Sequence, residues 1–216
     1  MKKRILTVLL SFCLLVGGAV GCFTGCSRPP KVEDIYDRVV ALIEASYELN
    51  TVFYGAGLPV HEDDSVYAEY THMYYGFTMA GDYEIVSEHA KFASVDEIKQ
   101  AAEKVYSKAY LEEVLYLGAF DGYAVEDGSG GAAVSSSRYQ EDGGGLYRSA
   151  RDKDYLNGDT RVYDYSSMKI ISPSDGDACT LKIDSYLLSD PEQVFSDTIR
   201  LVRQDDGLWY LDSFTG

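Results

Sequence analysis

Alternation of apolar and polar residues over the last third of the chain restricts its fold more than any other feature. In the segment CTLKIDSYLL, alternate residues from Cys179 to Leu187 fall on one face of an extended strand. Residues 162–171 form a second strand candidate, and Asp206-Gly207 makes a tight turn between two further alternating runs. The chain is therefore expected to end in an antiparallel sheet.

The last strand has two faces of different composition. Trp209 and Leu211 are expected on one face, and Leu208, Tyr210 and Phe214 on the other. The set that faces the N-terminal helix is expected to be buried.

That helix is predicted by apolar residues that recur at steps of three and four between Val32 and Tyr54. Gly55, Gly57 and Pro59 are expected to end it. The positions on its repeating face are Val32, Ile35, Val39, Leu42, Ile43, Ser46, Tyr47, Asn50 and Phe53.

Two shorter helices are expected in the middle of the chain. Ser94 and Glu97 have the spacing of a capping box, in which both side chains bond backbone N–H groups at a helix start. A second helix is expected from Ser107. Its expected buried residues are Tyr110, Leu111, Val114 and Leu115.

The glycine-rich residues 118–145 are expected to be a loop, with one strand near residues 134–139. Helices first and an antiparallel sheet last define an α+β fold. Residues 32–216 are expected to form one such domain, because their length suits a single core.

The first 21 residues have the pattern of a signal peptide. Lys2, Lys3 and Arg4 precede an uncharged run from Ile5 to Val16, which is too short to span a bilayer.

Two cysteines follow this run. AVGC, ending at Cys22, and FTGC, ending at Cys26, resemble the lipobox of bacterial lipoproteins, in which the cysteine thiol receives a diacylglyceryl group. Cys22 lies at the more usual distance from the apolar run, and an ordinary signal peptide with incidental cysteines is the alternative. The resemblance implies that residues 22–31 hold the lipidated cysteine and a tether, with the protein lipid-anchored on the extracytoplasmic face of the cell membrane.

Charge restricts the partners of this chain. It carries 19 Lys and Arg against 35 Asp and Glu, a formal net charge of −16. Such a charge repels nucleic acid and anionic lipid headgroups, so nucleic acid is excluded as a partner. The four cysteines provide neither a disulfide framework nor the Cys/His spacing of a zinc site, and no metal or cofactor is expected.

The sequence contains no catalytic motif. His61, His72 and His89 belong to no HExxH pair, no G-x-S-x-G elbow is present, and these histidines are expected to face solvent. Cys179 lies on the apolar face of its strand and is expected to be a buried packing thiol rather than a nucleophile.

Residues 152–159, DKDYLNGD, have the acidic spacing of a calcium loop. Gly158 comes one position too late for that loop, and its twelfth position holds no glutamate. Asn157-Gly158 is expected to make a tight turn, with calcium binding as the alternative.

Tyrosines are unusually frequent, and five of the 19 are close together: Tyr67, Tyr70, Tyr74, Tyr75 and Tyr83. Each buried hydroxyl needs a hydrogen-bond partner, so this group is not expected to be buried as a whole. Tyr is enriched in protein-recognition surfaces, and aromatic rings also stack on sugars. These five tyrosines are therefore the candidate contact surface.

The order of these elements, with the ending DDGLWYLDSF, resembles the NTF2-like (cystatin-like cone) superfamily, in which N-terminal helices pack on a curved antiparallel sheet. Residues 83–114 and 199–213 are also similar to the DL-endopeptidase inhibitor (IseA-like) group of extracellular proteins, which bind and restrain cell-wall hydrolases. The glycine-rich stretch 118–145 departs from the pattern of that group.

These observations predict a membrane-anchored lipoprotein that acts as a non-enzymatic binding module at the cell envelope, with a cell-wall hydrolase or wall glycan as partner. The alternative is a pocket enzyme or small-ligand-binding protein of the cone fold that uses Asp and Tyr side chains. Such an enzyme needs a carboxyl group whose pKa is raised by burial. Asp184 is expected to point away from the core, whereas the pattern leaves Asp212 undecided.

Overall fold

The computed structural model describes residues 30–61, 67–74, 77–126, 132–135, 137–150, 154–173 and 176–216. Only the backbone is described at residues 67–74, 77–82, 123–126, 132–135 and 173. The helices are α2 (Val32–Phe53), α3 (Val95–Ala102), α4 (Lys108–Tyr110) and the π-helical turns η1 (Leu111–Leu115) and η2 (Leu117–Asp121). The strands are β1 (Tyr67–Tyr74), β2 (Phe77–Ile85), β3 (Tyr123–Glu126), β4 (Ala132–Ser135), β5 (Tyr139–Asp142), β6 (Gly145–Ser149), β7 (Arg161–Pro173), β8 (Ala178–Leu187), β9 (Asp190–Arg203) and β10 (Trp209–Leu211).

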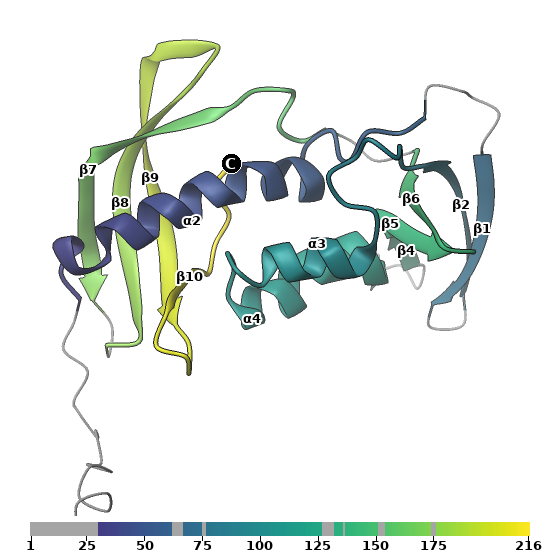
Figure 1. Ribbon diagram of the computed structural model, residues 1–216, viewed down its shortest axis with the longest axis horizontal. Coiled ribbons are helices and arrows are strands. Elements are labelled where there is room, and N and C mark those ends of the chain that lie inside the picture. Colours follow the sequence, from purple (N-terminus) through teal and green to yellow (C-terminus); the bar gives the residue numbers. More distant parts are fainter. Residues whose placement is uncertain are drawn as a thin grey trace, which may run out of the picture.

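Two four-stranded antiparallel sheets lie at opposite ends of the molecule (Figure 1). The C-terminal sheet has the strand order β10-β9-β8-β7, the other sheet has the order β1-β2-β6-β5, and β3 pairs with β4 alone. Helix α2 runs along one face of the C-terminal sheet toward the second sheet, and α3 and α4 lie beside it. The fold is α+β, as the order of sequence patterns predicts.

Helix α2 matches its predicted range to within one residue. Its predicted apolar face is buried apart from Val32 and Tyr47, which are half-buried, and Leu49 and Val52 are buried in addition. The chain leaves the helix through Gly57, whose φ of +78° lies in the left-handed region that glycine adopts without strain.

The predicted capping box at the start of α3 is present in its serine half. The hydroxyl of Ser94 accepts a hydrogen bond from the N–H of Glu97 at 3.1 Å. The carboxylate of Glu97 accepts from the N–H of Ala93 at 2.8 Å, one residue earlier than the usual box.

The helix that starts at Ser107 differs from its prediction. Leu111 and Leu115 are buried as expected and Tyr110 is half-buried, but the side chain of Val114 is 45% exposed. The chain turns from α4 into the π-helices η1 and η2, whose i→i+5 bonds wind it less tightly than an α-helix. Residues four apart then share a face, and a residue three along from Leu111 turns outward.

The expectation of a loop with one strand over residues 118–145 is wrong. This stretch contains the end of η2, the strands β3, β4 and β5, and the first residue of β6. Gly143 and Gly144, which have φ of +56° and +86°, form the turn of the hairpin between β5 and β6.

The C-terminal sheet forms the hairpins that the alternation predicts. Alternate residues of β8 from Cys179 to Ser185 are buried, and β9 pairs with β10 across the turn at Asp206-Gly207. A bulge interrupts the pairing of β7 with β8 beyond Asp164. The buried face of the sheet carries the core against α2.

Strand β10 corrects the expectation of one buried face. Trp209 and Leu211 are buried in the main core, and Leu208 and Phe214 are exposed as the alternation predicts. Tyr210 is nevertheless buried as well, because the guanidinium of Arg38 lies 5.3 Å from its ring centroid and its hydroxyl donates to Asp206 at 2.6 Å.

Candidate functional site

An open cleft of about 590 Å³ lies where the C-terminal half of α2 meets one end of the C-terminal sheet. Its walls come from α2, from the loop that leads into β7, from the end of β8 and from the last residues of the chain. Tyr47, Tyr155, Asn157, Arg161 and Phe214 are among the residues that line it. Segments distant in sequence therefore build this cleft together.

The loop before β7 is held in shape by its own backbone bonds. Asn157 and Gly158 have φ of 52° and 68°, and the N–H of Asp159 donates to the carbonyl of Leu156 at 3.0 Å. This is the predicted tight turn, in the form that needs two left-handed residues. The N–H of Tyr155 donates to the carbonyl of Tyr54 at 2.8 Å, which joins the loop to the end of α2.

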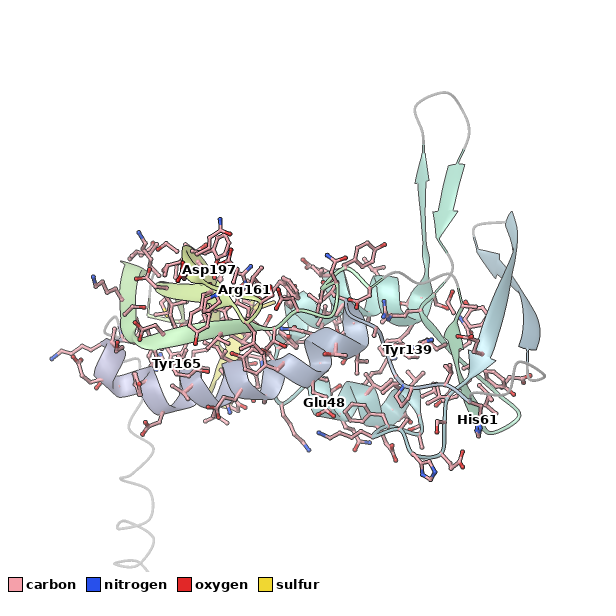
Figure 2. The ribbon with its side chains drawn as sticks, turned by 90° about the horizontal axis from the view of Figure 1, so that it is seen from above. Glu48, His61, Tyr139, Arg161, Tyr165 and Asp197 are labelled. Atoms are coloured by element: carbon pink, nitrogen blue, oxygen red, sulfur yellow. The ribbon has the colours of Figure 1, made fainter. Side chains whose placement is uncertain are left out.

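Arg161, the first residue of β7, is the central charged group of the cleft wall. Its Nη1 donates to Oγ of Ser185 at 2.9 Å and to Oδ2 of Asp197 at 3.1 Å, and its guanidinium lies 5.3 Å from the ring centroid of Phe195. Figure 2 shows Arg161 and Asp197 close together above the sheet. In the antiparallel register of β7, β8 and β9 these three residues are diagonal neighbours on one face of the sheet, so each strand supplies one member of the cluster.

Asp159 is a second charged group of the wall. Its carboxylate accepts from the hydroxyl of Ser189 and from the N–H of Thr160 at 2.8 Å. The bond from Ser189, followed by the one from Thr160, lowers the pKa of Asp159 below its usual value because both bonds favour the charged form. Asp159 therefore stays ionised at neutral pH.

The inner wall of the cleft rests on a buried network of hydroxyl and amide groups. Thr215 shares a 2.6 Å hydrogen bond with Ser46 and accepts from Nδ2 of Asn50 at 3.0 Å. Tyr106 donates to Oδ1 of Asn50 at 2.6 Å, and Tyr163 donates to the carbonyl of Thr215 at 2.9 Å. These bonds satisfy polar groups inside the core and hold the C-terminal segment against α2.

The tyrosines around the cleft act as neutral hydrogen-bonding groups. Burial is the main cause that raises the pKa of Tyr47, and it also raises those of Tyr163 and Tyr165. Figure 2 shows Tyr165 beside α2. At neutral pH their hydroxyls are therefore protonated.

The predicted tyrosine surface is described only in part. Tyr67, Tyr70 and Tyr74 lie in β1, but their side chains, and Tyr75 entirely, lie outside the described residues. Tyr83 is buried in β2, and its hydroxyl donates to the carbonyl of Ser137 at 2.8 Å. Its assignment to an exposed contact surface is therefore corrected, because this tyrosine packs inside the fold.

The other residues singled out from sequence have structural roles where they are described. Cys179 is buried, and burial raises the pKa of its thiol to about 11, so it is the predicted packing thiol. His61 and His89 lie at the surface beside Glu88, with His61 Nε2 3.0 Å from its carboxylate. The side chain of His72 lies outside the described residues, as do Cys22 and Cys26.

The two aspartates relevant to an enzyme are both engaged. Asp184 accepts from the hydroxyl of Ser196 at 3.0 Å and points away from the core, as predicted. Asp212 is 15% exposed, accepts from the hydroxyl of Ser107, and pairs with Nε of Arg200 at 2.8 Å. Asp212 thus joins the C-terminal segment to the start of α4 and to β9.

The Arg161–Asp197–Ser185 cluster was missed by sequence analysis. Its signal was present in part, since Ser185 interrupts the apolar face of β8 and Asp197 the matching face of β9. In the part of the chain that the structure describes, no group of three or more His, Cys, Asp or Glu side chains is arranged to hold a metal ion. No described helix is long and apolar enough to cross a membrane.

Comparison of the chain with protein-family models, with curated proteins and with solved structures gives no match.

Proposed function

We propose that this protein is a lipid-anchored module on the extracytoplasmic face of the cell membrane, which binds a partner at the envelope without catalysing a reaction. The observation that supports a non-catalytic role is the pairing of the charged groups inside the cleft, where Arg161 is held by Asp197 and Asp159 by Ser189. An acid or base catalyst must exchange protons near the working pH. The lowered pKa of Asp159 and the raised pKa of Tyr47 oppose such exchange and favour fixed hydrogen bonding.

The proposed partner is a cell-wall hydrolase. The net charge of −16 would steer the module toward basic proteins and raise the rate of encounter. The tyrosines of β1 and Tyr75 are proposed to contact this partner, because Tyr is enriched where protein interfaces are tightest.

The anchor is tested with cysteine variants. Wild-type protein is expected in the membrane fraction, because the two acyl chains of one diacylglyceryl group anchor it stably. The double variant Cys22→Ala/Cys26→Ala has no thiol to receive this group and is expected in the soluble fraction. The two single variants decide which cysteine carries the lipid. An unmodified wild-type chain, found by intact-mass measurement to begin at another residue, would contradict the anchor.

The partner is tested with the full chain immobilised and exposed to the secreted wall hydrolases of the organism that carries it. We expect a basic hydrolase to be retained, its wall digestion to slow, and its association rate to fall as salt rises. Tyr74→Ala is expected to speed dissociation, at a loss of about 1–3 kcal/mol of binding free energy. Tyr36→Ala, at an exposed tyrosine of α2, is the matched control. If no hydrolase is retained at low salt, a cell-wall hydrolase is rejected as the partner.

A further inference from the structure

The cleft exposes two aromatic rings, carried on segments that the fold holds in place. Tyr155 is 67% exposed, yet its backbone is bonded to Tyr54 at the end of α2. Phe214 is 36% exposed, and its ring meets the ring of Tyr54 edge-on at a centroid distance of 4.7 Å. Both rings offer apolar faces to a ligand, and a fixed backbone at Tyr155 and a packed ring at Phe214 reduce the conformational entropy lost on binding.

Hydrogen-bonding groups lie in the same cleft as these rings. Arg161 uses Nη1 for its bonds to Ser185 and Asp197, and within the described residues its Nε and Nη2 have no acceptor. The side chain of Asn157 is exposed in the adjacent turn and can both donate and accept. A ligand with hydroxyl groups can satisfy both kinds of partner.

The charges of the cleft argue for an uncharged ligand. Asp197 neutralises Arg161, and the ionised Asp159 leaves the wall with an excess negative charge. An anion would be repelled by this wall and by the acidic chain around it. A cation would find both carboxylates already bonded to serine hydroxyls.

We propose that the cleft binds a neutral saccharide, with sugar ring faces against Tyr155 and Phe214 and sugar hydroxyls bonded to Arg161 and Asn157. The volume of about 590 Å³ lies within the range of small-molecule sites. The proposal deepens the proposed function, since it assigns the cleft to wall glycan and leaves the tyrosines of β1 to the hydrolase.

The test measures binding of tri-N-acetylchitotriose and maltotriose to the full chain in a non-glycosidic detergent, by calorimetry and by saturation-transfer NMR. Trigalacturonate is the anionic comparison. At least one neutral trisaccharide is expected to bind, and its ring protons are expected to show the strongest saturation. Trigalacturonate is expected not to bind. Tyr155→Ala is expected to weaken binding about tenfold, as for loss of one central ring contact. Tyr36→Ala, at an exposed tyrosine near the start of α2, is expected to leave affinity unchanged.

Two results would overturn the proposal. The first is that neither neutral trisaccharide binds at millimolar concentration. The second is that Tyr155→Ala and Arg161→Lys, in variants with wild-type melting curves, leave saccharide affinity unchanged. Hydrolase capture by the same preparation separates the two proposals. Capture without saccharide binding would retain the binding module and reject the saccharide.

Discussion

At the scale of single residues, the junction after α2 depends on a glycine enclosed by two arginines. Arg148 Nη1 donates to the carbonyls of Ala56 and Leu58 at 2.7 and 2.8 Å, and Arg138 Nη2 donates to the carbonyl of Gly55. A Cβ atom at Gly57 would lie 2.8 Å from Cδ of Arg148. This junction sets where α2 ends and thus where the chain crosses to the second sheet.

Gly57→Ala is expected to destabilise the fold by about 2–4 kcal/mol, because left-handed strain and steric overlap add. Gly144→Ala is the matched control. It has the same sign of φ, at +86°, but open space around the added carbon, so only about 1 kcal/mol is expected there. Urea denaturation measures both losses. Equal losses would show that overlap at residue 57 is relieved by side-chain movement.

Asp206 carries a second residue-scale prediction, on pH. The hydrogen bond from Tyr210, and then that from the N–H of Leu208, lower the pKa of Asp206. A lowered pKa contributes stability above the usual carboxyl pKa of about 3.9, and this contribution is lost as pH falls through the lowered value.

Asp206→Asn is therefore expected to lower Tm at pH 7, with a difference from wild type that shrinks toward pH 3. Asp205→Asn removes the same charge at the neighbouring position and controls for net charge. Melting curves across this pH range measure both. A constant difference at all pH values would contradict the assigned role of the Asp206 carboxylate.

At the scale of elements, the two serine caps of the helix pair differ in what they join. Ser94 caps α3 alone through the N–H of Glu97. Ser107 accepts from the N–H of Tyr110 at 3.1 Å and also donates to Asp212, while its N–H donates to the carbonyl of Leu211 at 2.7 Å. The start of α4 is thereby fixed to the end of the C-terminal sheet.

Ser94→Ala is expected to cost about 1 kcal/mol of unfolding free energy, as is typical for loss of an N-cap. Ser107→Ala is expected to cost about 2–3 kcal/mol, because it also removes the donor to Oδ1 of the partly buried Asp212 carboxylate and leaves only the pairing of Oδ2 with Arg200. Each serves as the control for the other in urea denaturation. A smaller loss at Ser107 than at Ser94 would show that the bond to Asp212 contributes little.

At the scale of the whole molecule, the formal charge of −16 opposes folding through repulsion between acidic side chains. Several acidic residues are neutralised locally by surface pairs, such as Arg203 with Asp177 at 2.6 Å. Such exposed pairs stabilise little, so most of the repulsion persists and remains open to screening by salt.

Tm is therefore expected to rise between low and moderate salt, and by the same amount in NaCl and in choline chloride. CaCl2 and MgCl2 at matched ionic strength test the alternative that the loop at residues 152–159 binds calcium. CaCl2 and MgCl2 are expected to change Tm equally, because the carboxylates of Asp154 and Asp159 already accept hydrogen bonds from backbone N–H groups. A larger rise with calcium alone would reveal a calcium site.

The sequence by itself determined the local elements: α2, the cap at Ser94, the turn at Asn157 and the alternation of β8. Each depends on the backbone period or on a cap or turn residue within a few positions, so short stretches suffice to predict them. It also determined the burial of Cys179, which follows from its place in the alternation.

Only the tertiary structure decided the π-helical path that exposes Val114, the burial of Tyr210 beneath Arg38, and the cleft. Arg161 meets Asp197 because antiparallel pairing on both sides of β8 brings residues 36 positions apart close together on one face of the sheet. Strand register and helix packing set such contacts. Both are determined by the apolar surface that the whole core buries, and not by the few residues that come into contact.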